Sequence, residues 1–191
     1  MQKKVKIQQM AVESFSIPVG SNIIPFELPA TDGKNYSVES FKEAKALVVA
    51  FSCNHCPYAK AAWPLLIKLA DEFKDKSVSF VAINPNDEKQ YPEDSFEEME
   101  KRVVDWKINF PYLRDESQKV ARAYKAACTP DIYVYDNDRK LYYHGRINDN
   151  WQNPDEVKSE DLKNALNSLL AGDTPPQPQY PSLGCSIKWK E

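Results

Sequence analysis

The sequence predicts an α/β fold in which a central mixed sheet is flanked by helices. An unbroken apolar run over residues 46–51 leads into the motif Cys53-x-x-Cys56, a helix-forming segment follows, and a second apolar run covers residues 77–84. Both runs are too short for a helix core and contain several β-branched residues, so they are typical of strands buried on both faces. A strand, a helix and a strand at this spacing indicate a parallel βαβ unit, because parallel strands need a long crossover connection.

The size and composition of the chain are those of a globular domain with additions. At 191 residues, of which 42% are hydrophobic and 28% charged, it is long enough to bury a sizeable core. The formal net charge of -3 argues against a nucleic-acid partner. No apolar stretch approaches the length of a membrane span. Residues 1–10 have a charged start without an apolar stretch, so we expect no signal peptide and a cytoplasmic chain.

We expect one domain over residues 1–172 and a proline-rich tail over residues 173–191. The first 45 residues form an extension, in which a hairpin and a short helical turn are predicted over residues 26–28, 36–38 and 39–43. The tail is not periodic, but several of its side chains are costly to leave in water: Tyr180, Leu183, Ile187 and Trp189. Part of the tail is therefore expected to pack on the domain.

The remaining elements alternate between helices and short strands. The helix after the cysteine motif should reach about Phe73, with a kink at Pro64. Ser95 is a good N-cap for an inserted helix, since Glu98 completes a capping box. A further helix is expected to open at residues 115–118 and to end at Cys128-Thr129-Pro130.

A hairpin and a last helix complete the predicted fold. The hairpin strands are residues 131–135 and 141–147, and their tyrosines, at 133, 135, 142 and 143, are expected in the core or half-buried on the sheet. Ser159 is the predicted cap of the last helix, which Gly172 should end.

The Cys53-x-x-Cys56 motif indicates redox chemistry. Two thiols three positions apart in a turn can close a disulfide, and the N-terminus of a helix favours the negative charge of a thiolate. His55 lies between the cysteines and could add a positive charge, although a solvated turn residue with little effect on the thiols is the ordinary explanation. The motif therefore predicts thiol–disulfide exchange.

The order of the elements and four stretches of sequence resemble a known family. The stretches are Pro25-Phe26-Glu27-Leu28-Pro29 with Asp32-Gly33-Lys34, Phe51 to Tyr58, Thr129-Pro130-Asp131, and Gly145-Arg146-Ile147-Asn148-Asp149. With Cys-x-x-Cys at the start of the first helix, the chain looks like the thioredoxin superfold. More narrowly, it resembles the peroxiredoxin-like branch, the alkyl hydroperoxide reductase / thiol-specific antioxidant (AhpC/TSA) group. The likeness covers about residues 20 to 170.

The resemblance implies a role for each residue of the site. Cys53 would be an exposed attacking thiol and Cys56 a buried resolving thiol, with Asn54 and His55 between them. Thr129 would precede a cis-proline, Pro130, that faces both cysteines. A Cys53 thiolate, with its pKa lowered by His55 and the helix, would attack a disulfide, and Cys56 would release the product.

The resemblance also implies an antioxidant or redox role without a bound cofactor. The expected partners are a protein or small-molecule disulfide or thiol substrate, and a reductant that the sequence does not identify.

Several positions depart from the family patterns. Leu47 lies near the place where thioredoxins usually hold a buried acid, and it cannot move a proton. Asn54-His55 replaces the Gly-Pro of ordinary thioredoxins. If Cys56-Pro57 is aligned with the peroxidatic Cys-Pro of peroxiredoxins, Cys53 and Val49 replace the expected threonine and proline.

Two alternative functions therefore stay open. One is a thiol-dependent peroxidase that uses Cys56 or Cys53 against hydroperoxides. The other is a non-catalytic binding module or metal carrier. A zinc site would need two further ligands, for which the candidates are Cys128, Cys185 and His144.

Four residues have both an ordinary and a functional explanation. Cys128 is explained as a small buried apolar residue or as a third redox thiol, and Cys185 as a packing residue of the tail or as a resolving thiol. Arg146 and Asp149 are explained either by lining the site or by ion pairing at the surface.

Overall fold

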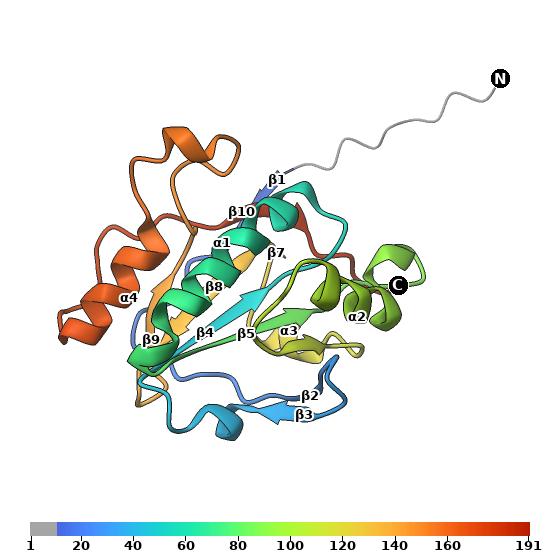
Figure 1. The fold of residues 1–191 in the computed structure, drawn as a ribbon, viewed down its shortest axis with the longest axis horizontal. Helices are drawn as coiled ribbons and strands as arrows, with labels where there is room; N and C mark the ends of the chain where they lie inside the picture. The colour runs from blue at the N-terminus through green and yellow to red at the C-terminus, as the bar shows by residue number, and fades with distance from the viewer. Residues whose placement is uncertain (1–10) are drawn as a thin grey trace.

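The computed structural model describes residues 11–191, so the prediction made for residues 1–10 lies outside the described part (Figure 1). The strands are β1 Ala11–Glu13, β2 Glu27–Pro29, β3 Asn35–Ser37, β4 Ala46–Phe51, β5 Val78–Asn84, β6 Tyr112–Arg114, β7 Cys128–Thr129, β8 Asp131–Tyr135, β9 Leu141–His144 and β10 Leu183–Ser186. The α-helices are α1 Pro57–Phe73, α2 Phe96–Asp105, α3 Lys119–Ala123 and α4 Asp161–Ala171. Short 3-10 helices are η1 Val38–Phe41, η2 Lys74–Lys76, η3 Pro92–Asp94 and η4 Pro154–Glu156. Among the described residues, no helix is both long and apolar enough to cross a membrane.

The centre of the fold is a mixed sheet with the strand order β6-β5-β4-β8-β9. Strands β4, β5 and β6 are parallel, whereas β8 is antiparallel to β4 and to β9. The predicted βαβ unit and the predicted hairpin are therefore both confirmed. A second small sheet has the order β1-β10-β7, and β2 pairs with β3 as the N-terminal hairpin.

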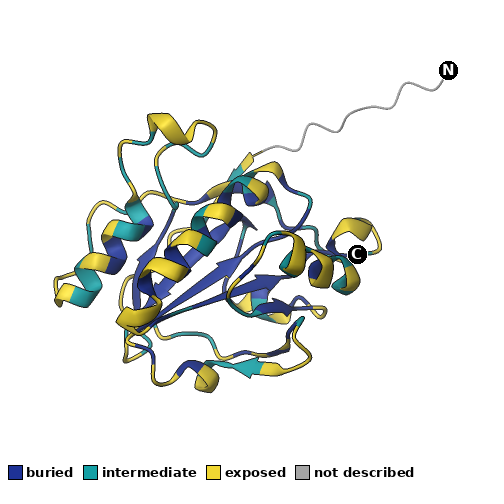
Figure 2. Ribbon diagram, viewed as in Figure 1, coloured by how far each residue is buried: buried dark blue, intermediate teal, exposed yellow. Residues whose placement is uncertain are grey.

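Strand β4 is buried on both faces, which explains why its sequence shows no alternation. Leu47, Val49 and Phe51 point to a core that the N-terminal hairpin, η1 and α3 cover. The residues between them point to a second core, which α1 and α4 cover. Figure 2 shows the central strands buried between helices whose outer faces are exposed.

Three predicted boundaries differ from the structure. Helix α3 ends at Ala123, so Cys128 and Thr129 form a short strand instead of ending the helix. Strand β9 ends at His144. The N-cap of α4 is Glu160, and the hydroxyl of Ser159 instead donates to the Asp161 carboxylate at 2.8 Å. The other end of α4 is as predicted, because Gly172 caps it with a left-handed φ of 81°.

Leu66 offers a test of the core between α1, α4 and the sheet, since its side chain is fully buried there. We expect Leu66→Ala to lower the free energy of unfolding by about 2–5 kcal/mol, because the cavity left behind adds to the lost burial. Chemical denaturation measures this difference. Lys68→Ala, at an exposed position of the same helix, is the control and should change stability by no more than about 0.5 kcal/mol. A loss for Leu66→Ala of the same size as in the control would contradict this packing.

Candidate functional site

The candidate site lies at the carboxyl end of β4, where three segments meet. Cys53 follows β4, and Asp94 lies in the loop after β5, the parallel neighbour of β4. On the other side, β8 begins opposite the end of β4 and is preceded by Thr129 and Pro130. The Thr129–Pro130 peptide bond is cis, which confirms that prediction. The register of the sheet therefore gathers residues that are up to about 80 positions apart in the chain.

Three cysteines form a buried cluster at this place: Cys53, Cys56 and Cys185. Cys56 is the N-cap of α1. The sulfur of Cys53 lies 3.2 Å from the hydroxyl oxygen of Thr129, and that of Cys56 lies 3.3 Å from the carbonyl oxygen of Thr129. The expectation of an exposed Cys53 is wrong, because both residues of the motif are fully buried. Strand β10, which carries Cys185, lies over them.

The contacts within the cluster concentrate negative charge on Cys56. Hydrogen bonds from the thiols of Cys185 and Cys53, together with the backbone N–H groups of Ala59 and Cys185, lower the pKa of Cys56 far below that of an ordinary thiol, although burial opposes this shift. The carbonyl oxygen of Thr129 has the opposite effect, because it can accept a hydrogen bond only from the protonated thiol of Cys56. Taken together, these interactions lower the pKa of Cys56, so it is the sulfur of the cluster that ionises most readily.

Cys53 has the opposite tendency. Its burial, its hydrogen bond to Cys56 and the nearby charge of Asp94 raise the pKa of the Cys53 thiol well above the ordinary value. The prediction of a lowered pKa for Cys53 is therefore wrong. The main physical reason is burial: the sulfur of Cys53 is fully enclosed and lacks the water that would stabilise its thiolate.

A titration of the reduced protein tests this assignment. Since the pKa of Cys56 is lowered, its thiolate should persist well below about pH 8.5, the ordinary thiol value, and disappear only as the pH falls through the lowered pKa. The ultraviolet absorbance of the thiolate measures it without requiring access to the sulfur. Cys56→Ser should remove this absorbance at neutral pH, whereas Cys128→Ala should keep it. A wild-type protein that gains thiolate absorbance only above about pH 8.5 would contradict the assignment.

Asp94 is a buried carboxylate that the sequence analysis did not identify. It accepts hydrogen bonds from the backbone N–H of Asn54 at 2.6 Å and from the side chain of Asn86 at 2.8 Å, and it bonds Nδ1 of His55 at 2.5 Å. Burial alone would raise the pKa of Asp94, but these bonds and the charge interaction with His55 lower it. The cysteine turn therefore has a buried, hydrogen-bonded carboxylate beside it, whereas Leu47 offers none.

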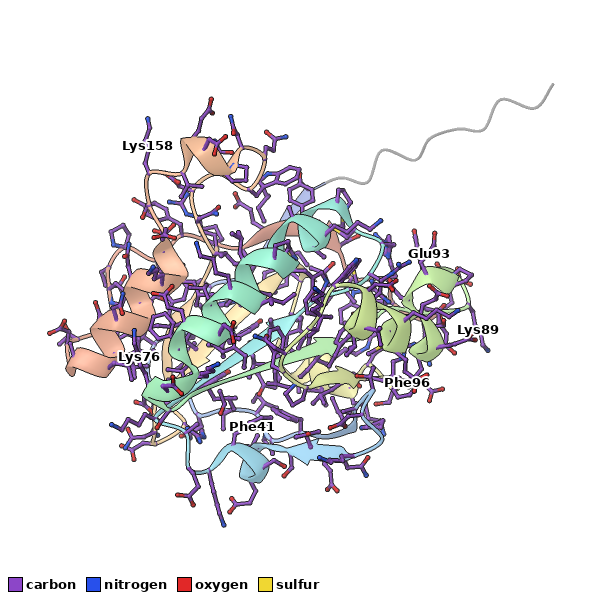
Figure 3. All side chains as sticks on the ribbon, in the orientation of Figure 1. Phe41, Lys76, Lys89, Glu93, Phe96 and Lys158 are labelled. Carbon is purple, nitrogen blue, oxygen red and sulfur yellow. The ribbon has the colours of Figure 1, made fainter. Side chains whose placement is uncertain are left out.

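Asn54 and Trp63 hold the cysteine turn in position. The side chain of Asn54 donates to the carbonyl of Glu93 at 2.8 Å and accepts from the hydroxyl of Tyr112 at 3.0 Å. The indole of Trp63 donates to the carbonyl of Cys53 at 3.0 Å. These bonds tie the turn to η3, β6 and α1, and Figure 3 labels Glu93 on the turn that carries Asp94.

Within the described residues, one group has the composition of a metal site. It consists of Cys53, His55 and Asp94, whose ligand atoms lie within 4.8 Å of one another. A thiolate, an imidazole and a carboxylate are ligands that suit Zn²⁺. Of the further zinc ligands considered from the sequence, His144 bonds Asp131 at 2.8 Å through Nε2 and Cys128 lies outside the cysteine cluster, whereas Cys185 belongs to it. Metal analysis of the reduced, purified protein tests whether the group binds an ion.

Cys128 lies outside the sulfur cluster. Thr129, its neighbour on β7, faces the cluster, so Cys128 points to the other side of the strand. Its thiol donates to the carbonyl of Pro130 at 3.4 Å, and burial raises its pKa. This environment is that of a structural cysteine.

A pocket of about 260 Å³ lies beside the cis-proline. Its wall includes Pro130 and the contacting rings of Tyr58 and Trp151, whose centroids are 3.9 Å apart. Arg146 and Asp149 also line this pocket. Arg146 is paired with the carboxylate of Asp161 at 2.7 Å, which confirms the explanation by ion pairing; it lines this pocket and not the cysteine cluster. The pocket suits an apolar or aromatic part of a substrate.

A comparison with models of protein families shows to which family the sequence is similar. The sequence model of the AhpC/TSA family matches residues 19–144. A search of curated proteins finds no match.

Solved structures are similar over most of the chain. An uncharacterized conserved protein from Geobacillus kaustophilus is 47% identical, with a TM-score of 0.92 over 96% of this chain and 98% of the other. A hypothetical protein from Sinorhizobium meliloti 1021 is 40% identical, with a TM-score of 0.89 over 93% and 98%. The thioredoxin domain of a thiol-disulfide oxidoreductase from Bacteroides vulgatus is 20% identical, with a TM-score of 0.64 over 81% and 99%, and shows the fold.

Proposed function

We propose that this chain, which belongs to the AhpC/TSA family and has the thioredoxin fold, is a thiol–disulfide oxidoreductase that acts through Cys53 and Cys56. One observation carries the proposal. The two buried sulfurs of one turn, Cys53 and Cys56, lie at the start of α1 against Thr129, next to the bonded pair of His55 and Asp94. This arrangement supplies a nucleophile, a resolving thiol and a proton acceptor, which are the groups that thiol–disulfide exchange needs.

The reaction would begin at Cys56. Its thiolate attacks one sulfur of a substrate disulfide, so that a mixed disulfide forms and the other half of the substrate leaves as a thiolate. Cys53 then loses its proton to the imidazole of His55 and attacks the sulfur of Cys56. The ionised carboxylate of Asp94 holds this imidazole in place and stabilises it once it is charged. The Cys53–Cys56 disulfide forms and the second half of the substrate leaves. Two electrons have moved to the substrate, and an external thiol reductant restores the dithiol.

The experiment that tests the proposal is reduction of a small aromatic disulfide in the presence of a thiol reductant. The wild-type protein should turn over, and Cys56→Ser should stop turnover. The double variant Cys53→Ser with Cys185→Ser, which keeps no second thiol in the cluster, should also stop it. Cys128→Ala is the matched control and should keep the wild-type rate. Full turnover without Cys56 would reject the proposal.

Hydroperoxide reduction is a second candidate activity, which one observation favours. The low-pKa sulfur belongs to Cys56, and Pro57 follows it at the first position of α1. Hydroperoxide consumption by the same variants, at the same reductant concentration, separates the two activities. A peroxidase would consume hydroperoxide faster than it reduces the aromatic disulfide, and Cys56→Ser would abolish this.

We include a cytoplasmic location in the proposal. Four cysteines in 191 residues are too few for a disulfide scaffold, which fits a compartment where thiol reductants keep cysteines reduced. Fractionation of cells that express the native chain tests the location.

A further inference from the structure

The C-terminal segment forms β10, which lies between β1 and β7 near the start of α1 (Figure 1). In its antiparallel register with β7, Cys185 is opposite Thr129 and Ser186 is opposite Cys128. Directly opposite residues of an antiparallel pair point to the same face. Because the hydroxyl of Thr129 contacts the sulfur of Cys53, Cys185 is directed at the same cluster.

Gly184 allows this close approach. A Cβ atom at this position would lie 2.2 Å from the carbonyl oxygen of Thr129, a distance that no side chain permits. The segment is also fixed on both sides of Cys185. The hydroxyl of Ser182 donates to the carbonyl of Gly145 at 2.8 Å, and the backbone N–H of Lys188 donates to the side chain of Asn86 at 2.9 Å. The tail therefore holds Cys185 at a defined place.

Cys56 has two thiol partners in this arrangement. The thiols of Cys53 and Cys185 both hydrogen-bond its sulfur. Cys53 comes from the same turn, whereas Cys185 comes from the far end of the chain. A sulfur in hydrogen-bond contact with a disulfide sulfur is placed for exchange, provided that it can give up its proton.

We propose that Cys185 is a third redox thiol, which competes with Cys53 for a disulfide with Cys56. The inference rests on the function proposed above. In the Cys53–Cys56 disulfide, Cys185 attacks the sulfur of Cys56. The Cys56–Cys185 bond forms as the Cys53–Cys56 bond breaks, and Cys53 leaves with the proton that Cys185 loses. The exchange needs no further oxidant, and it ties the tail covalently to α1.

The disulfides can be distinguished by peptide mapping. Trypsin should release Cys53 and Cys56 on residues 46–60, Cys128 on residues 126–139 and Cys185 on residues 164–188. A Cys53–Cys56 disulfide stays within one peptide, whereas a Cys56–Cys185 disulfide joins two peptides. The full-length reduced protein is oxidised with one equivalent of diamide, a thiol oxidant, and the remaining thiols are alkylated before digestion.

Cys53→Ser is the decisive variant. Oxidation should join residues 46–60 to residues 164–188 in this variant, and the further change Cys185→Ser should remove the link. Wild type should contain both disulfides, and Cys128→Ala should match wild type. If Cys53→Ser shows no such link while wild type forms the Cys53–Cys56 disulfide, the inference is overturned and the proposed function stands. If wild type forms neither disulfide, the proposed function fails.

Gly184→Val tests the geometry with all four cysteines present. The added side chain should push β10 away from β7, so the Cys56–Cys185 link should fall by about tenfold or more while the Cys53–Cys56 disulfide still forms. Ser186→Ala, a half-buried position of the same strand, is the control and should keep the link. An unchanged yield of the link in Gly184→Val, or a link from residues 46–60 to residues 126–139 in its place, would contradict the role of the strand.

Discussion

Replacing Cys56 by serine is expected to slow the reduction of a disulfide substrate by roughly 10³-fold or more. The reason is that Cys56 holds the thiolate of the cluster, while the pKa of Cys53 is raised. Cys53→Ser should keep the first step, the release of one thiolate from an aromatic disulfide. Stopped-flow absorbance in a single turnover measures this step directly.

The two variants must be compared with folded controls. Cys128→Ala removes a buried cysteine outside the cluster and should keep both steps. Thermal unfolding of each variant checks that the fold is retained. If Cys53→Ser abolished the first step and Cys56→Ser retained it, the roles of the two cysteines would be the reverse of those proposed here.

Asp94→Asn is expected to slow the second step, in which Cys53 resolves the mixed disulfide, by about 10²-fold or more. The substitution keeps the size of the side chain but removes the carboxylate that lies within 4.8 Å of the Cys53 sulfur. The first step should change much less, because Cys56 is already ionised. Separate rates for the two thiolates released from an aromatic disulfide measure this difference.

Glu93→Gln is the matched control for Asp94→Asn. Glu93 is exposed on the same turn, whereas Asp94 is buried, so both steps should keep their wild-type rates in Glu93→Gln. Equal slowing of both steps in Asp94→Asn would show that Asp94 only supports the turn through its bonds to Asn54 and Asn86.

The central sheet could be predicted from the sequence because its strands are continuous apolar runs. The apolar runs at β4 and β5 have hydrophobic side chains on both faces, so each run is stable only as a strand of a sheet that is covered on both faces. The small sheet β1-β10-β7 could not be predicted, since its strands are two to four residues long and have no periodic pattern. Their pairing depends on tertiary contacts, such as the approach of Gly184 to Thr129.

The candidate site was predictable in its residues but not in its electrostatics. The motif identified Cys53 and Cys56, but the direction of each pKa shift depends on the burial of Cys53 and on the contact of Cys56 with Cys185, which comes from the far end of the chain. Asp94 lies 41 positions after Cys53, in a polar loop. The topology offered one signal for Asp94. The loops after β4 and β5 are expected at the same edge of the sheet, because the two strands are adjacent and parallel.

The most direct test of the role of Cys56 is the capture of the mixed disulfide. Two double variants, Cys53→Ser with Cys185→Ser and Cys56→Ser with Cys185→Ser, each keep one cysteine of the cluster. They are mixed with one equivalent of a chromogenic aromatic disulfide and analysed by intact mass and tryptic peptides. We predict a rapid, stable adduct on residues 46–60 when Cys56 is kept, and little adduct when only Cys53 is kept. A faster adduct on Cys53 would contradict the assignment of Cys56 as the attacking thiol.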